Sequence, residues 1–91
     1  MGLQFLLRHF PRTVGVRVSY RPMQLTLEIE REEDGRWLAE VPQLPGVLAY
    51  GATSNEAMSR AEVLALRVLA ERIENGEAAP VPIHFVLPAA A

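Results

Sequence analysis

The chain lacks cysteine and lysine altogether, and it has only two histidines, His9 and His84. Without cysteine, disulfide bonds and thiolate metal sites are excluded. Neither histidine lies beside a carboxylate or a second histidine at the spacing that a metal site or a catalytic pair requires. No serine has a neighbouring general base, and no glycine-rich phosphate-binding loop is present. We therefore expect no catalytic residue, no cofactor and no metal site, and the chain is not predicted to be an enzyme.

Long apolar runs are missing as well. No stretch approaches the ~20 residues that a membrane-spanning helix needs. The apolar segment Leu3–Phe10 carries Arg8 and His9 and lacks the cleavage site of a secretory signal. We expect a cytoplasmic protein with no membrane partner. The formal net charge of −2 argues against a nucleic-acid binder, although the arginines near the N-terminus leave a contact with phosphates open.

The length and composition indicate one small globular domain, because the chain has 91 residues and 49% of them are hydrophobic. A chain of this size buries roughly 60–70% of the surface that it exposes when unfolded, so its core is modest. Self-association would bury more apolar surface. We therefore expect a homo-oligomer, either a dimer or a tetramer.

Alternation of apolar and polar residues predicts two strands in the first third of the chain. Val14–Tyr20 places every second residue on one apolar face, but Pro22 interrupts the pattern. Leu25–Glu30 is the clearest strand, with aliphatic and polar side chains on opposite faces. We interpret residues 1–22 as an N-terminal extension with an extra strand, and residues 23–91 as a single domain.

A turn at Glu33-Asp34-Gly35 joins this strand to its partner, Arg36–Val41. A two-residue turn would mix charged and apolar side chains on each face of the hairpin, which a half-buried sheet resists. A three-residue loop with a left-handed Gly35 instead sets Ile29 opposite Ala39. We predict the three-residue loop, and the inner face then carries Leu27, Ile29, Trp37, Ala39 and Val41.

A long helix is predicted over residues 54–75. Thr53 is its expected N-cap, in a capping box with Glu56, whose side chain should return a hydrogen bond to the Thr53 amide. Gly76 is the expected C-terminal stop.

One side of this helix is predicted to pack on the sheet. Val63 and Leu66 lie off the apolar stripe, and they are either scattered surface residues or part of an oligomer contact. Met58 and Leu69 widen the stripe on one flank. The stripe itself consists of Ala57, Ala61, Leu64, Ala65 and Val68.

Shorter segments complete the pattern. Pro42–Gly46 is an irregular loop, Val47–Tyr50 is a short third strand, and Pro82–Pro88 contains a last edge strand. The whole predicts an α+β fold, in which an antiparallel sheet of three to five strands carries one long helix on one face, in the order β-β-β-α-β.

The predicted register has an electrostatic cost. It places Glu28 directly opposite Glu40 on the outer face of the sheet, and like charges so placed are destabilising. One interpretation is a solvated acidic face that Arg31 or Arg36 neutralises. The other is a docking surface for a basic partner, because complementary charge speeds association and selects partners.

Residues between Glu30 and Pro80 follow an order that is typical of one protein family. It begins with the acidic hairpin Glu30–Trp37 and the loop Pro42–Gly46, and it continues with Gly51, Thr53, Glu56, Ala57, Ala61, Gly76 and Pro80. In this order the residues resemble the N-terminal domain of the HicB family of antitoxins. The resemblance covers the larger part of the chain.

The resemblance implies a reduced ribonuclease H-like domain that binds a HicA-like toxin, a small basic RNA-cleaving protein, and neutralises it directly. Many family members also carry a C-terminal DNA-binding domain. Nothing after Leu87 matches one, so DNA binding is not expected. The expected partner-binding residues combine the acidic face with the loop: Glu28, Glu30, Glu40, Gln43, Leu44, Pro45 and Gly46.

Two alternatives to an antitoxin or antitoxin-derived binding module stay open. One is a stand-alone structural domain that assembles with itself and has no toxin partner. The other is a degenerate ribonuclease H-like protein, which would require several converging carboxylates and a bound divalent metal ion.

Overall fold

The computed structural model describes residues 21–88 of the 91-residue chain. The predicted strand Val14–Tyr20 lies outside these residues. Within them the order of elements is the expected β-β-β-α-β pattern of an α+β domain, with the first strand in two segments. The elements are β1 (Met23–Thr26), β2 (Glu28–Arg31), β3 (Trp37–Glu40), β4 (Leu48–Gly51), α2 (Ser54–Glu74) and β5 (Ile83–Val86).

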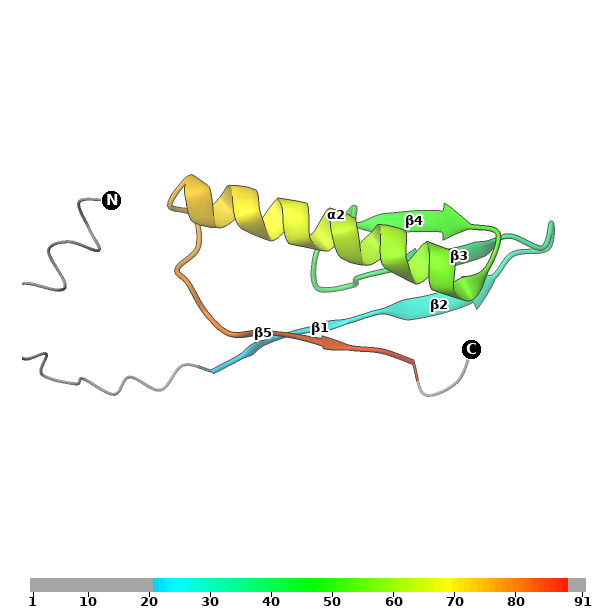
Figure 1. Ribbon diagram of the computed structural model, residues 1–91, viewed down its shortest axis with the longest axis horizontal. Helices are drawn as coiled ribbons and strands as arrows, with labels where there is room; N and C mark the ends of the chain where they lie inside the picture. The colour runs from blue at the N-terminus through cyan, green and yellow to red at the C-terminus, as the bar shows by residue number, and fades with distance from the viewer. Residues whose placement is uncertain (1–20, 89–91) are drawn as a thin grey trace, which may run out of the picture.

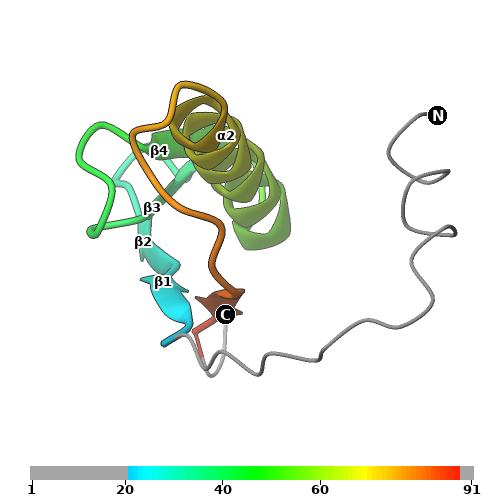
Figure 2. The ribbon, with the colours of Figure 1, turned by 90° about the vertical axis from the view of Figure 1, so that its left-hand side faces the viewer.

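The strands form two small sheets, and α2 runs along one side of them (Figure 1). β2, β3 and β4 form an antiparallel sheet in that order, whereas β1 and β5 pair in parallel. Seen along its axis, the helix covers one side of the strand layer (Figure 2). The described part of the chain therefore has two layers, and the last strand is parallel to β1, which a purely antiparallel sheet does not allow.

The predicted strand Leu25–Glu30 is divided at Leu27 because the chain changes partners there. β1 pairs with β5, and the Leu27 N–H still donates to the Val86 carbonyl at 2.9 Å. From Glu28 onward the chain pairs with β3. One continuous stretch of sequence thus supplies a strand to each sheet.

The hairpin between β2 and β3 has the predicted three-residue loop. The Glu32 N–H donates to the Arg36 carbonyl at 2.7 Å, and Gly35 has a φ of 89°. Ile29 lies opposite Ala39 and Glu28 lies opposite Glu40, as predicted. The loop conformation that only glycine adopts easily therefore determines which side chains face the helix.

The core lies between α2 and the sheet strands. Ala57, Ala61 and Ala65 are fully buried, and their small side chains let the helix approach the sheet closely. The predicted stripe is wrong at Leu64, which is 38% exposed, while Leu69 is 3% exposed and belongs to the core. The remaining core residues come from the strands and from the loop before β4: Leu25, Leu27, Ala39, Val41, Leu44 and Val47.

Both ends of α2 follow from local sequence. The Thr53 hydroxyl accepts a hydrogen bond from the Glu56 N–H at 3.1 Å, which satisfies one free amide of the first turn. The expected return bond from Glu56 is not among the hydrogen bonds of the described residues, and its carboxylate pairs with Arg60 at 2.7 Å. Gly76, with a φ of 74°, follows the C-cap Asn75.

Within the described residues, no helix combines the length and the apolar character that crossing a membrane requires.

Candidate protein-binding surface

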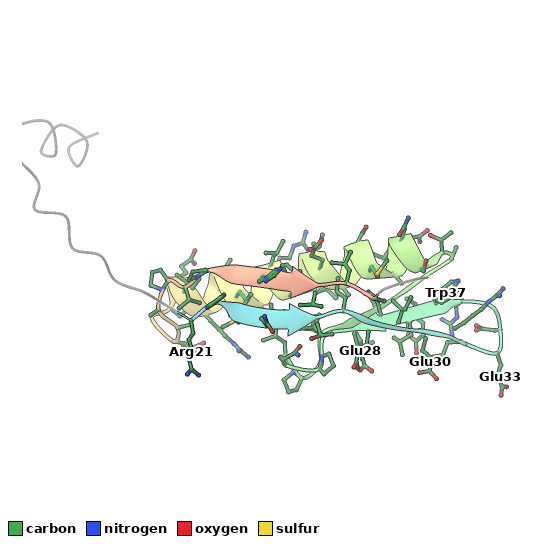
Figure 3. The ribbon with its side chains drawn as sticks, turned by 90° about the horizontal axis from the view of Figure 1, so that it is seen from below. Arg21, Glu28, Glu30, Glu33 and Trp37 are labelled. Carbon is green, nitrogen blue, oxygen red and sulfur yellow. The ribbon has the colours of Figure 1, made fainter. Side chains whose placement is uncertain are left out.

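Strand alternation places three glutamates on the side of the sheet that faces away from α2. Ile29 and Ala39 pack on the core, so their strand neighbours Glu28, Glu30 and Glu40 point to the opposite face. In Figure 3 the labelled Glu28 and Glu30 project from the same side of β2. We call Glu28, Glu30 and Glu40 the acidic face.

The acidic face surrounds a shallow, open depression. All three glutamates are exposed, and the half-buried Leu38 adds apolar surface between them because it lies opposite Glu30 on β3. Such a surface offers carboxylates and a patch of hydrocarbon to the same incoming side chain. The depression is lined by Thr26, Leu27, Glu28, Ile29, Glu30, Leu38, Glu40 and Pro88.

Arg36 lies on the same side of the sheet as the acidic face, but among the described residues neither Arg31 nor Arg36 forms an ion pair with its glutamates. Arg31 lies over the Trp37 ring at 5.8 Å, and Arg36 lies over the Tyr50 ring at 4.4 Å. The two ion pairs among the described residues are Arg36–Asp34 and Arg60–Glu56, each at 2.7 Å. Within this part of the chain, the acidic face therefore keeps its negative charge unpaired.

The tip of the hairpin carries charges of both signs, because Asp34 is paired with Arg36 there. Asp34 accepts hydrogen bonds from the Arg36 backbone N–H at 3.0 Å and from Arg36 Nε at 2.7 Å. These bonds lower the pKa of Asp34, with the backbone bond as the largest cause, because they favour the ionised carboxylate. Glu33 stands at the same end of the hairpin in Figure 3.

The loop Gln43–Gly46 divides into two structural and two exposed residues. The Gln43 side chain accepts a hydrogen bond from the Thr26 N–H at 3.0 Å and donates one to the Thr26 hydroxyl at 3.1 Å. Leu44 is 3% exposed and belongs to the core. Pro45 and Gly46 are exposed, and Gly46 has a φ of 89°. Gln43 and Leu44 therefore support the fold itself, and a role in partner binding stays a prediction for all four.

Three apolar residues of the outer face were missing from the predicted surface. Between β3 and β4, Leu38 lies opposite Tyr50 and Glu40 lies opposite Leu48. The apolar side chains of Leu38, Leu48 and Tyr50 are therefore on the same side of the sheet as the acidic face. The predicted register already contained this signal, since Leu38 alternates with Ala39 along the same strand.

Within the described residues, no three acidic or histidine side chains are grouped closely enough to hold a metal ion.

Comparison with known proteins identifies a relative that aligns with about two-thirds of this chain. The UPF0150 protein Ta0767 of Thermoplasma acidophilum is 32% identical over 68 residues, an alignment that covers 68% of this chain and 99% of the relative. No protein-family model matches the chain, and no solved structure matches it. Because the similarity extends over almost the entire relative, this chain belongs to the UPF0150 family.

Proposed function

We propose that this protein is a HicB-like binding module of the antitoxin type, which neutralises a small basic RNA-cleaving toxin of the HicA type by binding it. Membership of the UPF0150 family is a family-level pointer to such a role, and the HicB-like order of residues adds to it. The observation that carries the proposal is the acidic face, whose three exposed carboxylates have no ion pair within the described residues.

The acidic face suits a cationic partner for two physical reasons. Glu28 and Glu40 are direct cross-strand neighbours, so a positive group that docks between them removes a like-charge repulsion. Arginine forms strong charge-assisted hydrogen bonds to carboxylates, and its aliphatic stem packs on apolar surface such as that of Leu38. In this role the protein binds, and the RNA chemistry belongs to the toxin that it covers.

Charge reversal tests the proposal. The double variant Glu28→Arg/Glu40→Arg should associate more slowly with a HicA-type toxin encoded beside the gene for this chain. Long-range attraction raises association rates by ~10-fold or more at low salt, and this advantage falls steeply with ionic strength. Stopped-flow association at low and high salt measures the effect.

A matched control separates location from net charge. The variant Glu74→Arg/Glu77→Arg makes the same change in charge at two exposed positions near the C-terminal end of α2. It should keep most of the low-salt association rate. Equal slowing by the two double variants, or no slowing by Glu28→Arg/Glu40→Arg, would contradict a docking role for the acidic face.

A further inference from the structure

Positive charge is concentrated in the part of the chain that precedes β1. Residues 1–21 contain no acidic residue, and they contain four of the nine arginines, Arg8, Arg12, Arg17 and Arg21. The other five arginines and all eleven acidic residues follow, so the formal charge is +4 over residues 1–21 and −6 over residues 22–91. One chain therefore carries both an acidic face and a basic segment of complementary charge.

The basic segment joins the domain on the side of the acidic face. Arg21 is the first described residue, and it is exposed. In Figure 3 its side chain projects to the same side of the strands as Glu28 and Glu30. The segment before it, residues 1–20, lies outside the described residues, and we call it the arm. The arm is thus attached to a residue that already presents a positive charge on this side.

We propose that the arm binds the acidic face of its own chain and competes there with a basic partner. Its length is sufficient for this contact. Arg12 is nine positions before Arg21, and Glu30 is nine positions after it. At about 3.3 Å per residue, an extended arm that runs back along β1 and β2 brings both residues ~30 Å from Arg21, and therefore beside each other.

The pattern of side chains around Arg12 also matches the outer face. Phe10 and Val14 are two positions from Arg12 on either side, so all three side chains lie on one side of an extended segment. On the sheet, the half-buried Leu38 lies opposite Glu30, and Leu48, which is 43% exposed, lies opposite Glu40. An arginine between two apolar side chains therefore meets carboxylates that have apolar neighbours.

Covalent attachment favours the arm over a separate molecule as the occupant of the free protein. A ligand on a short linker has an effective concentration in the millimolar range, which a separate molecule has to exceed. Two exposed ion pairs favour the bound arm by about 2- to 30-fold in population. A basic toxin can displace such a contact, and the arm lowers the apparent affinity for it by up to about the same factor. This last consequence rests on the proposed function.

Paramagnetic NMR of the full chain tests the contact without a toxin. The chain has no cysteine, so Thr13→Cys provides a single attachment point for a nitroxide label in the arm. The label should broaden the amide signals of the acidic face more strongly than those of Leu66 and Ala70, which are exposed on α2. In a mixture of labelled chain and isotope-enriched unlabelled chain, the enriched signals should stay sharp, because the contact is within one chain.

Charge variants of the labelled protein identify the cause of the broadening. Arg8→Gln/Arg12→Gln should remove most of it, as should about 1 M salt, where the screening length is about 3 Å. Arg67→Gln/Arg72→Gln is the control, because it removes two exposed arginines from α2 and makes the same change in net charge. The control should keep the broadening. Equal broadening of the acidic face and α2, broadening that survives Arg8→Gln/Arg12→Gln, or broadening between chains in the mixture would overturn the proposal.

Binding of a HicA-type toxin tests the competition separately. Arg8→Gln/Arg12→Gln should bind the toxin up to about 30-fold more tightly than the wild type, and more tightly than Arg67→Gln/Arg72→Gln. Equal affinities for the two double variants would refute the competition. A toxin that binds none of these proteins would count against the proposed function, whereas the NMR result would still decide whether the arm binds the acidic face.

Discussion

The like-charge pair across β2 and β3 leads to a prediction about stability as well as binding. Glu28 and Glu40 lie directly opposite each other, and both side chains are exposed. Replacing Glu40 with glutamine keeps the shape of the side chain and removes one of the two charges. We expect Glu40→Gln to stabilise the fold, because the repulsion exists in the hairpin and is weaker in the unfolded chain.

The magnitude follows from the geometry of the pair. Directly opposed charges in a sheet contribute roughly 0.2–1 kcal/mol. For a domain of this size, 1 kcal/mol shifts the melting temperature by about 4–8 °C, so the gain should be about 1–8 °C. Because both side chains face solvent, the effect should fall towards zero near 1 M salt, where the screening length is about 3 Å.

Thermal unfolding of the wild type and of Glu40→Gln at low and high salt measures this gain. Glu33→Gln is the control, since Glu33 lies in the three-residue loop and has no cross-strand neighbour. It removes the same charge, and it should raise the melting temperature less. In the same proteins, Glu40→Gln should slow association with a basic toxin.

Three outcomes would refute the reasoning. The first is an unchanged or lower melting temperature for Glu40→Gln at low salt. The second is a gain that persists at high salt, which would show that it does not come from charge. The third is an equal gain for Glu33→Gln, which would place the effect in the net charge of the hairpin.

Three further variants test the loop before β4, the contact between β4 and α2, and the tip of the hairpin. A Cβ added at Gly51 would lie 2.5 Å from the Ala57 backbone N, so Gly51→Ala should cost about 1–3 kcal/mol in the free energy of unfolding. A Cβ added at Gly46 has no atom within 4 Å, but the backbone there is left-handed, so Gly46→Ala should lower the free energy of unfolding by about 1–2 kcal/mol. Urea unfolding of the two variants compares these costs. The lowered pKa of Asp34 predicts stability that is present above its ordinary pKa of 3.8 and is lost as the pH falls through the lowered value. Asp34→Asn should lack this acid-dependent loss in unfolding curves between pH 7 and about pH 2, and an unchanged acid response would contradict the prediction.

The local sequence was enough to determine the hairpin and the helix ends. At the hairpin, the alternation of Leu25–Glu30 left one acceptable register, and Gly35 made the matching three-residue loop available. At the helix, the Thr53 cap and the glycine after Asn75 marked the boundaries within one residue. These features depend on residues close together in the chain, so their physical causes are visible in the sequence.

Contacts between distant segments decided the rest. The parallel pairing of β5 with β1 brings together segments separated by about sixty residues, and no local pattern specifies strand direction. Gln43 binds Thr26 across 17 positions, so a loop glutamine that looked available to a partner supports the fold. The state of the acidic face was likewise decided by tertiary contacts, because Arg31 and Arg36 lie over the rings of Trp37 and Tyr50 and form no ion pair with its glutamates among the described residues.

The sequence by itself thus determined which residues alternate, turn and cap, because these depend on backbone conformation over a few positions. The tertiary structure alone decided how far the helix is rotated on the sheet. The close contact at Gly51 brings the helix N-terminus against β4, and the same rotation buries Leu69 and leaves Leu64 exposed at the sheet edge. Helical periodicity specifies the spacing of a buried stripe, but the packing partner selects which residues it contains.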